Sequence, residues 1–95
     1  MLVYKLIKLK KDKKKYAIIT PENKIIKFGA TGYEDYTIHH DSNRKMNYIK
    51  RHQVREDWND LNKAGTWSRY VLWEKKNLND ALDNMEDLFG IIIES

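Results

Sequence analysis

The sequence contains no cysteine, no long apolar run and no repeats, and these absences remove several classes of protein. Without cysteine there are no disulfide bridges, no thiolate zinc sites and no thiol catalysis, which fits a reducing compartment. No apolar stretch approaches the roughly 20 residues that span a bilayer. The start does not resemble a signal peptide, because Lys5 and Lys8 interrupt it and no small-residue cleavage site follows. We therefore expect a soluble protein that is neither secreted nor bound to a membrane.

Apolar and aromatic residues are abundant for a chain of 95 residues. Hydrophobic residues make up 41% and aromatic residues 12%, which is too rich for a disordered tail and sufficient for one modest core. Three Trp and six Tyr supply rings that fill a core while their polar tips stay hydrated. We expect a single domain over residues 1–95, with a β-meander and loop in residues 1–40 and a helical part in residues 41–95.

Three short segments of the first half have strand character. They cover residues 2–9, 15–20 and 24–28. In the third segment, Ile26 and Phe28 fall on one face and Ile25 and Lys27 on the other. The Gly-Ala-Thr-Gly sequence at residues 29–32 indicates a turn that ends the sheet; it is not a phosphate loop, because neither Gly-Lys-Ser/Thr nor a helix follows.

Capping signals and apolar spacing predict the helices of the second half. Asp41 or Ser42 caps a helix that runs to about Arg55. Its predicted inner face comprises Met46, Ile49 and Gln53, and a second stripe comprises Arg44, Tyr48, Arg51 and Arg55.

Two further helices are predicted after this one. Thr66 is expected to cap an aromatic helix over residues 67–74. Asn77 begins a last helix that Gly90 closes, and its core-facing stripe is Leu78, Leu82, Met85 and Phe89. Residues 91–93 add a short strand or cover the core. The predicted class is therefore α+β: a small three-stranded antiparallel β-meander followed by two or three packed α-helices.

Charge is distributed unevenly along the chain. Residues 1–55 carry 14 Lys and Arg against five Asp and Glu, a net charge of +9, whereas residues 56–95 carry four against nine, a net charge of −5. Such an asymmetry indicates an electrostatic partner or end-to-end packing between copies.

The basic half offers two groups of cations as a candidate binding surface. The helix group is Arg44, Lys45, Tyr48, Arg51 and Arg55, flanked by Lys50; the hairpin group is Lys10, Lys11, Lys13, Lys14 and Lys15, preceded by Lys8. Arg and Lys neutralise backbone phosphates, and a Tyr among them stacks on an unpaired base. We expect these residues to contact nucleic acid or another polyanion. An acidic protein surface or a second copy of the chain is the alternative.

Sites for catalysis or metals have little support in the sequence. His39, His40 and His52 loosely resemble the ββα-metal nucleases, but the order of base, Asn and ligand is not met, and His52 lies about 15 Å along the helix. Glu56, Asp57 and Asp60 around Trp58 are expected to cap a helix or pair with Arg55, and Ser68 has no visible His and Asp partners. We predict no enzyme activity, no cofactor, no metal and no small-molecule substrate.

Several motifs in fixed order resemble one family. They include Phe-Gly-Ala-Thr-Gly-Tyr-Glu-Asp-Tyr at residues 28–36, Glu-Asp-Trp-Asn-Asp at 56–60 and Ala-Gly-Thr-Trp-Ser-Arg-Tyr at 64–70. The sequence over residues 15–75 resembles short, uncharacterised proteins of giant and other large double-stranded DNA viruses, and of some tailed phages. It departs from that pattern after Trp73, where the family has a Pro. The resemblance implies a viral setting and no known activity.

Within this pattern, Asp35, Arg51 and Arg69 are candidates for internal ion pairs, and Trp58, Trp67 and Trp73 for packing. Our leading hypothesis is a non-enzymatic viral protein that binds nucleic acid through the basic hairpin and helix face. The second is a minor virion or capsid-associated protein that assembles with viral structural proteins or as a homo-oligomer, and a metal-dependent nuclease is third. The expected location is the virion, or the cytoplasm or nucleus of an infected cell.

Overall fold

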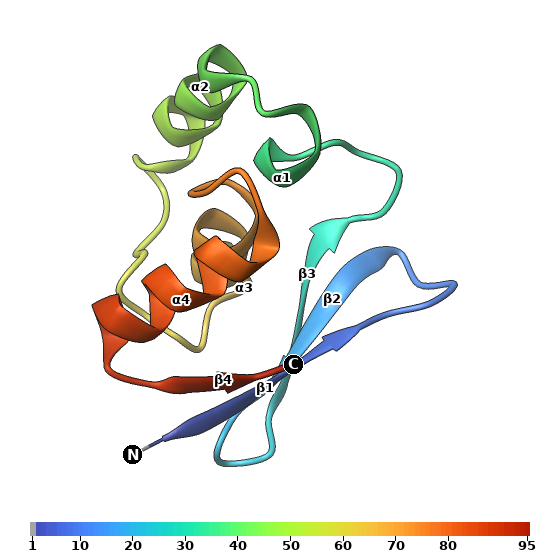
Figure 1. The fold of residues 1–95 in the computed structure, drawn as a ribbon, viewed down its shortest axis with the longest axis vertical. Helices are drawn as coiled ribbons and strands as arrows, with labels where there is room; N and C mark the ends of the chain where they lie inside the picture. The colour runs from blue at the N-terminus through green and yellow to red at the C-terminus, as the bar shows by residue number, and fades with distance from the viewer. Residues whose placement is uncertain (1) are drawn as a thin grey trace.

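A four-stranded mixed sheet forms one layer of the protein in the computed structural model, which describes residues 2–95 (Figure 1). Strands β1 (Val3–Lys8), β2 (Lys14–Ile19) and β3 (Ile25–Ala30) pair antiparallel, and β4 (Ile92–Glu94) pairs parallel to β1, in the order β3-β2-β1-β4. The predicted meander is therefore confirmed, and the segment after Gly90 adds a fourth strand to it.

Side chains alternate across this sheet and divide it into a covered and an open face. In β3, Ile26 and Phe28 are buried whereas Ile25 and Lys27 are exposed, as the alternation predicted. Figure 1 shows the helices gathered on one side of the sheet, so this side buries the apolar residues. The α+β class is confirmed.

The helical layer consists of short elements. They are α1 (Tyr36–His39), α2 (Ser42–His52), α3 (Ala64–Trp67), a π-helical turn η1 (Ser68–Leu72) and α4 (Leu78–Phe89). None of these helices, which all lie within residues 2–95, is long and apolar enough to cross a membrane. Helix α1 was not predicted, because only four residues form it and its cap, Asp35, is held by the tertiary structure.

Helix α2 differs from the prediction in its end and in its buried face. Asp41 caps it, as expected, but the helix ends at His52 instead of Arg55. The Arg55 amide donates to the His52 carbonyl at 3.1 Å in the turn that follows. The predicted inner residue Met46 is 49% exposed, whereas Tyr48 is buried. The buried residue of α2 therefore comes from the stripe that contains the arginines, and not from the predicted inner face.

Thr66 does not cap the aromatic segment, which corrects the second helix prediction. It lies buried inside α3, and its hydroxyl donates to the carbonyls of Asp60 at 2.6 Å and Asp57 at 3.2 Å. The Thr66 side chain therefore holds the preceding loop in place by hydrogen bonds and does not cap a helix. The expected helix over residues 67–74 is instead the end of α3 followed by η1, which still buries its aromatic and aliphatic residues.

The last helix follows the prediction closely. The Asn77 side chain accepts from the Asp80 amide at 2.8 Å, and Gly90 ends α4 in the left-handed region at φ 63°. Leu82 and Met85 are buried in the core. The Glu86 carboxylate accepts from the Ile93 amide at 2.8 Å and so leads the chain into β4.

Trp67 lies at the centre of the hydrophobic core. It is fully buried, with the Tyr4 ring at 5.4 Å and the Phe28 ring at 6.5 Å between centroids, and its indole N–H donates to the Leu61 carbonyl at 2.9 Å. Rings from β1 and β3 thereby meet a ring from the helical layer. The core joins the first and second halves of the chain.

Gly29 allows the helical layer to approach the sheet at one point. Its φ is +79°, and a Cβ at this position would lie 2.8 Å from Cδ1 of Leu72, which is itself buried in the core. Gly32 also has a positive φ, of +89°, but nothing lies within 4 Å of its Cβ position. A side chain at Gly32 would therefore cause only backbone strain, whereas a side chain at Gly29 would also clash with Leu72.

We predict that Gly29→Ala destabilises the protein more than Gly32→Ala. Both variants carry the cost of a side chain in the left-handed region, roughly 1 to 2 kcal/mol. Only Gly29→Ala adds a clash with a buried side chain, roughly 1 to 3 kcal/mol more. The free energy of unfolding in urea measures both, and equal losses in the two variants would contradict the close approach.

Candidate functional site

A groove of about 460 Å³ lies where the sheet, the loop after β3 and three helical elements meet. Its lining includes Lys14, Tyr33, Arg51 and Trp73, together with Gly29 at the point of closest approach. These residues come from β2, the loop after β3, α2, the segment after η1 and β3. A cavity of this size falls within the range of sites for small ligands, about 300 to 1,000 Å³. We refer to it as the basic groove.

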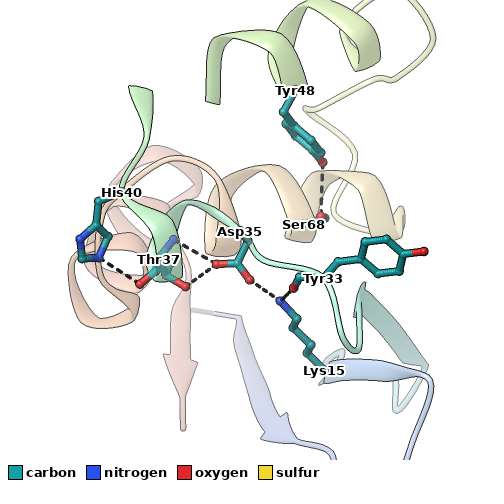
Figure 2. A network of polar contacts seen from close by, with 7 residues as sticks. All are labelled: Lys15, Tyr33, Asp35, Thr37, His40, Tyr48 and Ser68. Carbon is teal, nitrogen blue, oxygen red and sulfur yellow. Dashed lines mark hydrogen bonds and ion pairs between the residues drawn. The ribbon is translucent and has the colours of Figure 1, made fainter. Parts of the chain in front are cut away.

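A buried ion pair fixes one side of the basic groove (Figure 2). Lys15 Nζ lies 2.7 Å from Oδ2 of Asp35, which is only 3% exposed, and it also donates to the Tyr33 carbonyl. The other oxygen of Asp35 accepts from the Thr37 amide at 3.0 Å and from the Thr37 hydroxyl. This carboxylate therefore joins β2 to the loop and caps α1.

Stacked aromatic rings form the opposite side. The Tyr48 ring lies 4.4 Å from the Trp73 ring with only 4° between their planes, and 4.3 Å from the His52 ring. Its hydroxyl donates to Ser68 Oγ at 3.3 Å (Figure 2). Burial raises the pKa of the Tyr48 hydroxyl above its usual value, so the ring stays neutral at physiological pH. The predicted stacking of Tyr48 on a base stays untested, but Trp73 and His52 already stack on this ring, which is only 7% exposed.

Two of the predicted binding cations are also engaged within the protein. Lys15 is held by Asp35. Lys45 Nζ donates to the Glu74 carbonyl at 2.7 Å and lies 4.9 Å from the centre of the Tyr36 ring. Arg44 approaches Glu34 at 3.5 Å, but both side chains remain about half exposed. The ammonium groups of Lys15 and Lys45 thus have partners within the protein, and their predicted contact with a polyanion stays untested.

The remaining predicted cations stay exposed, and the structure brings several of them together. Lys14 of the hairpin and Arg51 of α2 both line the basic groove. Arg51 and Trp73 also line an adjoining hollow, together with Arg44, Asn47 and Lys50. Of the predicted binding residues, four exposed cations line neither hollow: Lys10, Lys11, Lys13 and Arg55. One exposed lysine of the hairpin group and one arginine of the helix group therefore line the same groove, and the rest of the exposed predicted cations lie outside it.

Local contacts hold the hairpin in shape. The Asp12 carboxylate accepts from the Lys14 amide at 2.8 Å and from Lys27 Nζ at 2.9 Å. The hydrogen bond from Lys27 lowers the pKa of the Asp12 carboxyl below its usual value. The Lys13 carbonyl accepts from the Thr31 amide at 2.9 Å. The hairpin is therefore tied to the end of β3, beside the basic groove.

The three histidines take part in separate contacts. His39 Nδ1 accepts from the Asp41 amide at 2.9 Å, the His40 ring contacts the Thr37 carbonyl at 3.1 Å, and His52 lies 3.6 Å from Glu56. Across residues 2–95, no group of three or more His, Cys, Asp or Glu side chains is arranged to hold a metal ion. The arrangement offers no support for the nuclease hypothesis.

The acidic residues near α2 have structural contacts. The Glu56 carboxylate accepts from the Trp58 indole N–H at 2.7 Å, and the carboxylates of Asp57 and Asp60 accept from the amides of Asn59 and Asn62. The predicted helix cap and the predicted pair with Arg55 are both absent from residues 2–95, because Asp57 and Asp60 close turns and Glu56 lies beside His52.

Two of the three residues predicted to form internal ion pairs do so. Asp35 pairs with Lys15, and Arg69 pairs with Glu74 beside the rings of Trp58 and Tyr70. Arg51 is exposed and forms no ion pair within residues 2–95, so the prediction for this residue is wrong. Arg51 is therefore a free cation beside the basic groove.

Sequence reasoning missed Tyr33 as a site residue. Its side chain lines the basic groove and is 74% exposed. The available signal was an aromatic residue placed directly after Gly32 in a polar loop, but that spacing alone does not distinguish a core ring from a surface ring.

A family model described as a family of unknown function, DUF5754, matches residues 4–52, more than half of the chain. The chain belongs to the DUF5754 family. The segment that defines DUF5754 here contains the antiparallel meander, the Lys15–Asp35 pair and all of α2, whereas Ser68 and Trp73 lie outside it. No curated protein and no solved structure matches the chain significantly. The function of this DUF5754 protein is therefore argued from its site.

We predict that Asp35→Asn lowers the free energy of unfolding by roughly 3 kcal/mol, because it leaves a partly buried lysine without its counter-charge. Asp12→Asn is the matched control, because it weakens an ion pair whose Lys27 side chain is about half exposed. Exposed pairs contribute only about 0 to 1 kcal/mol. Urea unfolding of both variants measures the difference, and equal effects would show that the Lys15–Asp35 pair is not an anchor.

Proposed function

We propose that this DUF5754 protein is a non-enzymatic viral protein that binds nucleic acid through the basic groove and its flanking cations. The observation that carries the proposal is that Lys14 and Arg51, from opposite ends of the basic half, line the same groove. The viral setting and the proposed location, in the virion or in the infected cell, rest on the resemblance of the sequence motifs.

Free cations and a concave surface suit a charged backbone. Phosphates are neutralised by Lys and Arg side chains that have no competing partner, and Arg adds bidentate hydrogen bonds. Lys14, Lys50 and Arg51 are exposed and close to the two hollows. The engaged cations, Lys15 and Lys45, hold the surface in shape instead.

Each acidic group in the lining of the basic groove lies beside a basic side chain. Of its three carboxylates, Asp35 pairs with Lys15, Glu34 lies near Arg44, and Glu56 lies near His52. The four acidic residues of α4 are absent from the groove lining within the described part of the chain. Within the groove itself Lys14, Lys15 and Arg51 balance the three carboxylates, so the excess positive charge comes from Arg44 and Lys50, which line the adjoining hollow.

We predict a steep loss of nucleic-acid affinity with added salt, because binding through phosphates releases counterions. Lys50→Gln with Arg51→Gln should lower affinity and reduce the slope of log affinity against log salt by about one unit per lost phosphate contact. Fluorescence anisotropy with labelled oligonucleotides at several salt concentrations measures both quantities.

The matched control is Lys5→Gln with Lys24→Gln, which removes the same charge from exposed positions that do not line the basic groove. This control should retain most of the affinity and nearly the full salt slope. The absence of binding at low salt would refute the proposal, and an equal effect of the two double variants would show that the groove is not the binding surface.

A second candidate, a structural protein that self-associates, is favoured by the open face of the sheet. The alternation of the strands places six aliphatic residues there: Val3, Ile7, Ala17, Ile19, Ile25 and Ile92. Lys5, Lys27 and Glu94 share this face, so it carries both signs of charge. A face with aliphatic residues and both charges can pair with a copy of itself.

For this second candidate, we predict that the protein forms dimers or larger assemblies that Ile25→Glu dissociates, because Ile25 is 62% exposed on the open face. Val54→Glu is the control, since Val54 is exposed in a turn outside the sheet. Sedimentation equilibrium over a range of protein concentrations measures the assembly state. A monomer at every concentration would refute the structural role.

A further inference from the structure

Tyr33 presents a large ring to solvent from a rigid position. Its amide donates to the Ala30 carbonyl at 3.3 Å, and its carbonyl accepts from Lys15 Nζ, which is itself paired with Asp35. Figure 2 shows the ring extending away from this network. The backbone of Tyr33 is thus fixed at two points, whereas its ring is free to contact a ligand.

The surroundings of Tyr33 distinguish it from an isolated surface aromatic. Its side chain lines the basic groove together with Lys14 and Arg51. An exposed ring in the same groove as exposed cations suits an unpaired strand, because the ring stacks on a base and the cations contact the phosphates. Tyr48, the ring predicted from the sequence, is already covered by Trp73 and His52.

The size of the basic groove agrees with a ligand on the scale of a nucleotide. Its volume of about 460 Å³ matches a small-molecule site. In a duplex the faces of the bases are stacked on one another, so Tyr33 has no base face to meet. An unpaired strand presents these faces directly, and single-stranded segments are recognised in this way.

We infer that the basic groove binds an unpaired nucleic-acid strand, with one base stacked on Tyr33 and the neighbouring phosphates held by Lys14 and Arg51. This inference rests on the proposed function and narrows it to single-stranded DNA or RNA.

The test compares labelled 12-nucleotide single strands of DNA and RNA with a 12-base-pair DNA duplex by fluorescence anisotropy at low salt. Single strands should bind about tenfold or more tightly than the duplex. Tyr33→Ala should weaken single-strand binding by roughly tenfold, within the range found for base–aromatic stacking, and leave duplex affinity and the salt slope unchanged. Tyr33→Phe keeps the ring and should retain binding. The single strand that binds more tightly shows whether the protein prefers DNA or RNA.

Ile38→Ala is the matched control, because Ile38 is exposed on the neighbouring α1 but does not line the basic groove. Circular dichroism verifies that each variant is folded. If single strands and duplex bind equally and Tyr33→Ala has no effect, this inference is overturned while the proposed function stands. If neither binds at low salt, the proposed function itself fails.

Discussion

The buried ion pair between Lys15 and Asp35 is the constraint on which the candidate site depends. A carboxylate that is nearly inaccessible to water must be paired and hydrogen-bonded, because its desolvation is costly. Satisfying Asp35 joins β2 to the loop after β3, caps α1 and holds the Tyr33 carbonyl. One charge pair therefore determines how the chain passes from the sheet to the helical layer and where the groove opens.

Local patterns predicted the elements whose residues interact mainly with near neighbours. Alternation in β3 and the caps of α4 depend on contacts two to four residues apart, and both predictions are confirmed. The buried face of α2 was predicted wrongly, because Tyr48 is buried by Trp73, 25 residues later. The hydrogen bonds from Thr66 to the Asp60 carbonyl and from Lys45 to the Glu74 carbonyl were not predicted either. Their acceptors are backbone groups that follow no local sequence pattern.

The family match and the hydrophobic core divide the chain differently. The segment matched by DUF5754 supplies the antiparallel strands and α2, but Trp67, Val71 and Met85, which cover the sheet, lie beyond its last matched residue. Without these three residues, the apolar side chains of the sheet would be exposed to water. A sheet in that state does not form a stable core alone. The charge asymmetry follows the same division, because the basic half forms the sheet and α2, whereas four acidic residues lie on α4.

The strand order leaves β3 and β4 as the two edges of the sheet. The β4 edge is only three residues long, whereas β3 offers six residues, with the aliphatic side chain of Ile25 in solvent. An edge strand of this kind is a template for pairing with other chains, and lysines on it discourage such pairing. Lys27 lies on β3 and pairs with Asp12 of the hairpin. A charged side chain at this position disfavours the addition of a further strand to the open edge.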